Sequence, residues 1–194
     1  MPRDVRKIKT ERDIQRAFLA LLTAKGFRQL TVADICTTAM ISRSTFYAHY
    51  LDKYDLLEQM VARFTAMFAQ RVSVRFQQML NGQIDALVHS LLDDMAENRQ
   101  TIQVLFTVHE PDADLRANFT ALLYHEWAQF IAAQEQSPAV PTELIADMGT
   151  NVQMTLINWA VDHGEVSLDA VAAAVNTIRK AVLIQIQATD SPTK

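Results

Sequence analysis

The chain has 194 residues and a net charge of −4, and 49% of its residues are hydrophobic while only 4 are Gly and 5 are Pro. This composition excludes disordered, low-complexity and collagen-like chains, and it favours helices. The single cysteine, Cys36, excludes an internal disulfide and a cysteine-rich metal site, and no apolar run approaches the roughly 20 residues that span a bilayer. We therefore expect a cytoplasmic protein that does not enter a membrane.

The first predicted helix covers about residues 11–25. Its apolar residues recur at helical spacing from Ile14 onward, which indicates one buried face. Thr10 with Asp13 matches a capping-box pattern at the start of this helix. Gly26 tolerates the left-handed backbone with which many helices end, so the helix is predicted to stop there.

Three more helix starts follow closely. Thr31 and Asp34 repeat the capping pattern before a short helix over residues 32–39, and Ser42, a strong N-cap residue, precedes another over residues 43–49. A longer fourth helix follows them.

Beyond residue 80 the apolar periodicity predicts longer helices. Two lie between residues 84 and 109, a third starts at Asp112, a fourth runs from Pro141 to about His163, and the last follows Ser167. With about nine helices and no credible strand, the predicted fold class is all-α.

The charge divides the chain into two parts. Residues 1–53 hold ten Lys and Arg against five Asp and Glu, whereas residues 54–194 hold eight against seventeen. A basic end on an acidic protein indicates that this end faces a polyanion, although an unevenly charged solvated surface is the alternative. We expect residues 1–53 to form an N-terminal domain and residues 54–194 a larger helical domain.

The second and third helices, with the first as support, have the arrangement of a helix-turn-helix motif. Phe46 and Tyr50, four residues apart, supply a stripe that buries the third helix against the other two. Arg43 and Ser44 are left outward, where Arg43 has the fork geometry to bond a guanine edge in the major groove. The alternative is a helical hairpin in which the Ser and Thr residues only cap and the aromatic residues only pack.

The segment "TVADICTTAMISRSTFYAHYLDKYDLL" closely resembles the DNA-binding segment of TetR-family transcriptional regulators. It has a Thr-started second helix, an Ala before the turn, a hydrophobic-Ser pair, then Thr-hydrophobic-Tyr, an aromatic residue at position 50 and a Lys before a Leu-rich fourth helix. The resemblance covers about residues 10–60. It implies that the remaining helices form a variable domain for ligand binding and dimerisation.

Carried over by position, the resemblance implies a set of side chains that face DNA: Thr31, Arg43, Ser44, Thr45, Tyr47, His49 and Lys53. Ser42, at a helix N-terminus, is also expected to contact phosphate. The motif is held together by Ile35, Ala39, Ile41, Phe46 and Tyr50. Ala48 stands where many relatives have a larger side chain, so a contact expected there is weak or missing. The leading "RDVRKIK" is either a basic arm along phosphates or the minor groove, or a disordered polar tail.

The resemblance also implies a homodimer through the last two helices, and hence a nearly palindromic operator in double-stranded DNA. The last helix carries more apolar surface than one stripe requires: Leu168, Val171, Ala172, Val175, Ile178, Ala181, Val182, Leu183 and Ile186. This excess favours a partner helix.

A cavity for a small-molecule effector is expected among the middle helices. Its candidate lining is rich in Met and aromatic residues, each of which is also a normal core residue: Phe64, Met67, Phe68, Phe106, His109, Phe119, Tyr124, Trp127, Met154 and Trp159. The residues that would orient a ligand stay open among His109, Tyr124, His125, Asn158 and Asp162.

The sequence offers little basis for catalysis. No pair of His residues has the i, i+4 spacing of a helical metal site, and no P-loop, dinucleotide-binding Gly pattern or nucleophile elbow occurs. We therefore expect no enzyme activity, metal or cofactor. The function predicted is a ligand-responsive, TetR-like dimeric repressor, and the alternative is a TetR-shaped coactivator or adaptor that acts through a partner protein.

Overall fold

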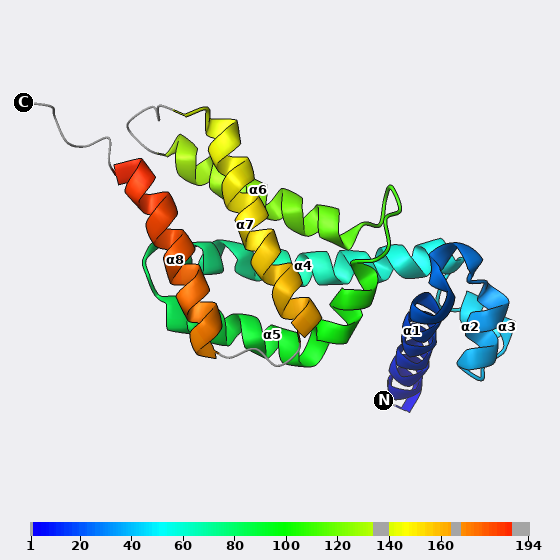
Figure 1. The fold of residues 1–194 in the computed structure, drawn as a ribbon. Coiled ribbons are helices and arrows are strands. Elements are labelled where there is room, and N and C mark those ends of the chain that lie inside the picture. The colour runs from blue at the N-terminus through cyan, green and yellow to red at the C-terminus, as the bar shows by residue number, and fades with distance from the viewer. Residues whose placement is uncertain (1, 134–139, 164–167, 188–194) are drawn as a thin grey trace, which may run out of the picture. The chain divides into compact units, whose positions relative to one another are not determined.

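The structure is a computed structural model that describes residues 2–133, 140–163 and 168–187. Its regular elements over these ranges are all α-helices, which confirms the predicted fold class (Figure 1). They are α1 (Pro2–Gln29), α2 (Val32–Thr38), α3 (Arg43–Tyr47), α4 (Lys53–Leu80), α5 (Ile84–Leu105), α6 (Leu115–Ala132), α7 (Thr142–His163) and α8 (Leu168–Gln187).

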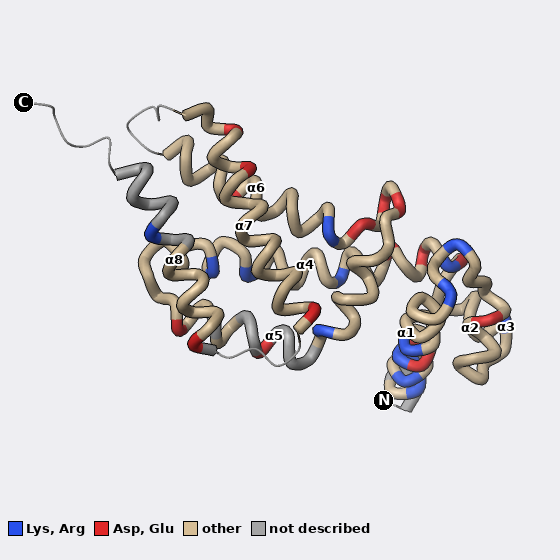
Figure 2. Tube along the Cα trace, in the orientation of Figure 1, with Lys and Arg blue, Asp and Glu red and all other residues tan. Residues whose placement is uncertain are grey.

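Helix α1 starts nine residues earlier than the capping pattern at Thr10 predicts. The basic segment "RDVRKIK" therefore lies in the first two turns of a helix and is not the disordered tail that the sequence left open, whereas its role as a basic arm on DNA stays a prediction. Most Lys and Arg residues of the N-terminal part lie along this helix (Figure 2). The predicted stop at Gly26 is confirmed as an interruption of α1, because this residue has a positive φ of 74°.

The helix-turn-helix elements agree with their predicted positions to within two residues. Helix α2 runs over Val32–Thr38, and α3 over Arg43–Tyr47. Helix α5 differs, since it continues to Leu105 where two helices were predicted between residues 84 and 109. Helix α6 begins at Leu115, three residues after the predicted start at Asp112.

By its internal contacts the chain forms two compact units. The first contains residues 1–64 and 101–115, and the second contains residues 65–100 and 116–194, so that the boundary falls within α4 and α5. This division by contacts differs from the boundary predicted after residue 53. That boundary separates a DNA-binding part from a ligand-binding part, and it stays a prediction.

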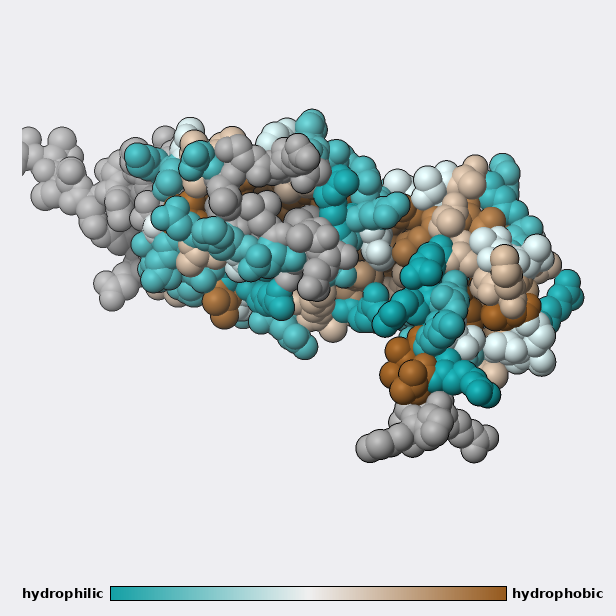
Figure 3. All heavy atoms as spheres, turned by 90° about the horizontal axis from the view of Figure 1, so that it is seen from below, coloured by the Kyte–Doolittle hydropathy of each residue, from teal (hydrophilic) through white to brown (hydrophobic). Residues whose placement is uncertain are grey.

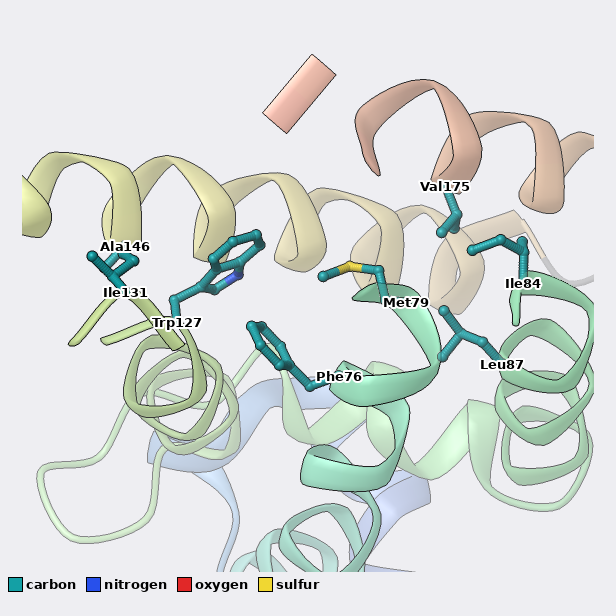
Figure 4. Close-up of a cluster of buried hydrophobic side chains, with 8 residues drawn as sticks. All are labelled: Phe76, Met79, Ile84, Leu87, Trp127, Ile131, Ala146 and Val175. Carbon is teal, nitrogen blue, oxygen red and sulfur yellow. The ribbon is translucent and has the colours of Figure 1, made fainter. Parts of the chain in front are cut away.

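Each unit has its own hydrophobic core. In the first unit, Phe18 and Ile14 of α1 are fully buried together with Phe46 of α3. In the second, a cluster draws on α4, α5, α6, α7 and α8: Phe76, Met79, Ile84, Leu87, Trp127, Ile131, Ala146 and Val175 (Figure 4). Hydrophilic residues predominate on the face of the molecule shown in Figure 3.

Helices α6 and α7 pack closely at Gly149. A Cβ atom added there would lie 2.7 Å from Cζ2 of Trp127. The Trp127 ring meets Phe76 edge to face, with ring centroids 5.0 Å apart, and its Nε1 donates a hydrogen bond to Oε1 of Gln153 at 3.0 Å. Among the described helices, none is long and apolar enough to cross a bilayer.

Candidate nucleic-acid interface and interior cavity

The start of α2 is fixed by a capping box, as the sequence predicted. The Thr31 Oγ1 accepts a hydrogen bond from the Asp34 backbone N–H at 3.2 Å, and the Thr31 backbone N–H donates to Oδ2 of Asp34 at 2.8 Å. The Asp34 carboxylate also pairs with the Lys25 ammonium of α1. These partners, with Lys25 as the largest cause, lower the pKa of Asp34 to about 2. The carboxylate therefore ties the start of α2 to the end of α1.

The turn after α2 is a Schellman motif with a methionine in the place that glycine usually takes. The Met40 backbone N–H donates to the carbonyl of Thr37 at 3.2 Å, and the Ile41 N–H donates to the carbonyl of Cys36 at 3.0 Å. Met40 has a φ of 54°, and its side chain is 93% exposed. The turn thus keeps its geometry at a cost in backbone strain.

Helix α3 begins at a serine cap. The Ser42 Oγ accepts a hydrogen bond from the Thr45 backbone N–H at 3.0 Å, and it lies 2.8 Å from the hydroxyl oxygens of Ser44 and Thr45. Ser42 is exposed, as are Arg43 and Ser44. A hydroxyl cluster and one guanidinium therefore stand at the open start of this helix.

The opposite face of α3 is buried, as predicted. Phe46 is fully buried and Tyr50 is 3% exposed. The Tyr50 hydroxyl accepts a hydrogen bond from Nε2 of Gln15 on α1 at 3.1 Å, and burial raises the pKa of Tyr50. Cys36 is also buried, and this burial raises the pKa of its thiol.

The remaining predicted DNA contacts differ in exposure. Tyr47 is 55% exposed and meets Phe46 edge to face. Thr31 is exposed, whereas Thr45 and His49 are half-buried. Ala48 is exposed and forms the C-cap of α3.

Lys53 does not stand outward as the sequence predicted. Its Nζ donates to the carbonyls of Phe27 and Leu30 at 2.9 Å and to that of Arg28 at 3.3 Å. The ammonium also lies 4.7 Å from the centroid of the Phe27 ring. Because these carbonyls belong to the end of α1 and the segment after it, Lys53 fastens the start of α4 to the end of α1.

The second unit contains a cavity of about 90 Å³. Its lining comes from α4, α5, α6, α7 and α8: Phe68, Val72, Arg75, Phe76, Met79, Leu87, Leu123, Gln153, Leu156, Ile157, Ala160, Val171 and Val175. Most of these residues are aliphatic.

Only Phe68 of the ten predicted pocket residues is among those that line this cavity. Phe64, Phe106 and His109 belong to the first unit, where both phenylalanines are buried and Nδ1 of His109 lies 2.7 Å from Oδ2 of Asp114. The others have different positions in the second unit: Phe119 stacks on Phe68, Trp127 and Met154 are buried, Met67 and Tyr124 are half-buried, and Trp159 is 40% exposed. Which of these residues contact an effector stays a prediction.

The polar residues considered for ligand orientation are not among the lining residues either. His125 and Asp162 are exposed, and Asn158 is half-buried. The charged residue that lines the cavity, Arg75, was missed. It follows Val72 and precedes Phe76 and Met79 in the apolar stripe of α4. A charged residue inside an apolar stripe was the signal that could have identified it.

Arg75 is 7% exposed. Its Nε donates to Oγ of Ser90 at 3.0 Å, and its Nη2 donates to the carbonyl oxygen of Ser90. Burial first, and then repulsion from Arg71, lower the pKa of Arg75 to about 10. The guanidinium is therefore still charged at neutral pH.

The fold and the exposed start of α3 define a helix-turn-helix protein of the kind that reads DNA with a short second helix. Residues 14–60 match the family model of bacterial regulatory proteins, tetR family. Together with the all-α fold, this match confirms the resemblance to TetR-family transcriptional regulators seen in the sequence.

One curated relative agrees with this resemblance. A curated protein of Bacillus subtilis (strain 168), described as the uncharacterized HTH-type transcriptional regulator YxbF, is 35% identical over 72 residues, which are 37% of this chain and 19% of that protein. The match thus spans about a fifth of the length of this curated relative.

Two solved structures share the fold. The TetR transcriptional regulator of Streptococcus agalactiae 2603V has a TM-score of 0.61 at 21% identity, over 92% of this chain and 98% of that chain. Thermus thermophilus FadR, a TetR-family transcriptional repressor in complex with lauroyl-CoA, has a TM-score of 0.51 at 18% identity, over 95% and 98%.

Proposed function

We propose that the protein is a dimeric transcriptional repressor that binds a nearly palindromic operator through α3 and releases it when a small molecule occupies the cavity of the second unit. The observation that carries this proposal is the division of α3 into two faces. Phe46 of α3 and Tyr50, three residues after its end, anchor the helix, while Arg43, Ser44 and Tyr47 are exposed. An anchored helix with a polar outer face is what entry into the major groove requires.

Each exposed group has a role in this proposal. The Arg43 guanidinium donates two parallel hydrogen bonds to N7 and O6 of a guanine. Ser44 and Tyr47 contact the flanking bases or the backbone, and the Thr31 and Ser42 ends of α2 and α3 lie against phosphates. The basic residues of α1 add attraction that does not depend on sequence. Lys53 supports the motif and does not contact DNA.

The direct test compares Arg43→Ala with the native protein on the DNA upstream of its own gene. Loss of a bidentate contact to guanine costs about 1–3 kcal/mol, so the affinity for this DNA is expected to fall roughly 5- to 150-fold. Affinity for unrelated DNA should change much less. Fluorescence anisotropy with labelled duplexes measures both.

The salt dependence of the same binding separates DNA recognition from the adaptor alternative. Neutralised phosphates release counterions, so the affinity should fall steeply between 50 and 200 mM salt, by roughly 10³-fold or more if about six phosphates are contacted. If neither the native protein nor Arg43→Ala binds the upstream DNA better than unrelated DNA, the repressor proposal fails.

The proposed homodimer uses α7 and α8. On α7 the exposed apolar residues Leu144, Met148 and Trp159 are spaced so that they share one side of the helix. A second copy covers this side, and exposed Ala173 of α8 lets a partner helix approach. The predicted α8 residues Leu168, Ile178, Ala181, Val182, Leu183 and Ile186 have side chains outside the described residues. Two-fold symmetry then places the two α3 helices about one DNA turn, roughly 34 Å, apart.

The ligand response rests on the cavity of the second unit. FadR has this fold and is a repressor that was solved with lauroyl-CoA, which supports both the repressor direction and a small-molecule ligand here. A ligand weakens operator binding only if it binds more tightly to the conformer that fits DNA poorly. Coupling of 1–3 kcal/mol, typical of such linkage, changes operator affinity about 5- to 150-fold.

A further inference from the structure

Helix α3 is too short to fix its own orientation. It has five residues, and an isolated helix of that length is not stable in water. Its orientation therefore depends on side chains that join it to neighbouring elements. Phe46 supplies a buried apolar contact, which is not directional, whereas a hydrogen bond has a preferred direction. A hydrogen bond of this kind joins Tyr50, just after α3, to α1.

Tyr50 is held from two sides. Its backbone N–H donates to the carbonyl of Phe46 at 3.0 Å, so Tyr50 stays one helical turn away from the buried residue of α3. Its side chain is 3% exposed, and its hydroxyl oxygen accepts a hydrogen bond from Nε2 of Gln15 on α1 at 3.1 Å. A buried hydroxyl without a partner is unfavourable, so this bond favours one orientation of the tyrosine.

The Gln15 amide is itself set in one orientation. Its Nε2 also donates to Oε1 of Glu11 at 3.2 Å, and its Oε1 accepts from Nη1 of Arg63 on α4 at 3.5 Å. A carboxylate only accepts hydrogen bonds and a guanidinium only donates them, so a flipped amide would meet both with the wrong atom. Glu11 and Arg63 thus keep the amide nitrogen of Gln15 toward Tyr50.

The four side chains of this network all belong to the first unit, and they come from α1, the turn after α3 and α4. We propose that Gln15 is a positioning residue for operator recognition, whose amide holds Tyr50 and thereby the orientation in which α3 presents Arg43 to the major groove. Gln15 itself does not touch DNA. This inference rests on the proposed function and deepens it, because it names a residue that sets the geometry of the proposed interface.

Loss of the bond between Gln15 and Tyr50 has a defined consequence for binding. Helix α3 then samples orientations besides the one that fits the groove, and the affinity for the operator falls with the fraction of molecules in the competent orientation. A buried hydrogen bond corresponds to a roughly 2- to 12-fold change in such an equilibrium. Binding to unrelated DNA depends mainly on surface charge, so it should stay nearly constant.

The test is a double-mutant cycle in the full chain, in which fluorescence anisotropy measures the affinity for the DNA upstream of its own gene and for unrelated DNA. Gln15→Met removes the amide from an unbranched side chain, and Tyr50→Phe removes only the hydroxyl. Each is expected to lower the ratio of the two affinities at least twofold. The double variant should lose no more than the larger single effect, because both substitutions break the same bond.

Gln59→Met is the matched control. The Gln59 amide donates to Oδ1 of Asp55 on its own helix, α4, at 2.9 Å, so its removal breaks a hydrogen bond within one element. This variant should keep the native ratio of affinities. Thermal unfolding of each variant verifies its fold, and if Tyr50→Phe does not fold, the comparison of Gln15→Met with Gln59→Met decides.

The possible results separate positioning from stability. An unchanged ratio in Gln15→Met, with or without a lower melting temperature, overturns the proposal. Reductions that add in the double variant overturn it as well, because the two side chains then act separately. In both cases the native protein still prefers the upstream DNA, and the proposed function stands. A native protein without that preference contradicts the proposed function itself, and this inference with it.

Discussion

The Lys53 ammonium is bound by three backbone carbonyls and lies over the ring of Phe27. Hydrogen bonds to a charged group each contribute about 1.5–3 kcal/mol to stability. Their contribution is smaller here, because Lys53 is half-buried and water also solvates its ammonium group. We predict that Lys53→Gln lowers the free energy of unfolding by about 2 kcal/mol, measured by urea denaturation. Arg28→Gln, at an exposed position in the same region, should change it by less than about 0.5 kcal/mol.

The DNA-binding data for Lys53→Gln distinguish support from contact. A supporting residue changes stability and leaves the salt dependence of DNA binding nearly unchanged. If the variant is as stable as the native protein and instead binds DNA with a salt slope reduced by about one, Lys53 contacts a phosphate and its assigned role is wrong.

Asp34 makes stability depend on pH in a defined direction. Its pKa is lowered to about 2 from the ordinary 3.8 by Lys25 and Thr31, so the folded state binds this proton more weakly than the unfolded chain does. The stabilisation is therefore complete above about pH 4–5 and is lost as the pH falls through 3.8 toward 2. We predict that the stability difference between native protein and Asp34→Asn, from denaturation at several pH values, shrinks across this window. A difference independent of pH would contradict the assignment.

At the scale of the elements, the turn between α2 and α3 has a residue that its backbone does not favour. A non-glycine residue in the left-handed region costs about 1–2 kcal/mol, and the Met40 side chain is 93% exposed, so it gains little by burial. We predict that Met40→Gly raises the free energy of unfolding by about 1 kcal/mol after the added chain entropy of glycine. Chemical denaturation measures this gain.

Ala39→Gly is the matched control, because Ala39 precedes Met40 and has a φ of −77°. Glycine relieves no strain there and should lower stability by about 0.5–1 kcal/mol. A loss of stability in Met40→Gly as well would show that the left-handed conformation is not strained in this turn.

Helix ends in the N-terminal unit were predictable because their signals are local. The Thr31 capping box, the Ser42 cap and the break at Gly26 each depend on residues within four positions of one another. The start of α1 could not be predicted in this way, because the pattern at Thr10 resembles a helix cap but lies inside the helix. The Thr10 hydroxyl donates a hydrogen bond to the carbonyl of Arg6, four residues earlier. A local cap signal does not exclude an earlier start.

The position of the cavity could not be predicted from local sequence signals, because a cavity depends on which faces of different helices meet. Of the aromatic residues predicted to line it, Phe68 does so, whereas Phe119 stacks on Phe68 and Trp127 packs against Gly149 between α6 and α7. Spacing along one helix identifies a buried face and does not say which part of it stays unfilled. Lys53 shows the same limit, since its partner carbonyls lie 23 to 26 residues earlier in the chain.

At the scale of the whole molecule, the proposed recognition of a palindromic operator requires two α3 helices held at a fixed spacing, which one chain does not supply. The affinity of a dimer for a two-half site exceeds that of a single motif because the second contact is made within the complex. Any change that weakens the dimer should therefore weaken operator binding, even without touching α3.

The dimer surface proposed on α7 makes this testable. We predict that the native protein sediments with twice the 21.9 kDa mass of the chain, and that Met148→Glu raises the dimer dissociation constant at least tenfold. Met148 is 61% exposed, and two-fold symmetry brings the new carboxylate into an apolar interface close to its symmetry mate, where desolvation and like-charge repulsion oppose association. The operator affinity of Met148→Glu should fall as its dimer dissociates.

Val74→Glu is the control for this prediction, since Val74 is 60% exposed on α4 and the substitution introduces the same charge outside the surface proposed on α7 and α8. It should leave both the mass and the operator affinity near those of the native protein. Analytical ultracentrifugation and anisotropy on the same samples measure the two quantities. If Met148→Glu remains dimeric while Val74→Glu dissociates, the subunits associate through a different face and α7 must be reassigned. If both variants are dimeric and bind operator normally, the exposed side of α7 has no part in the assembly.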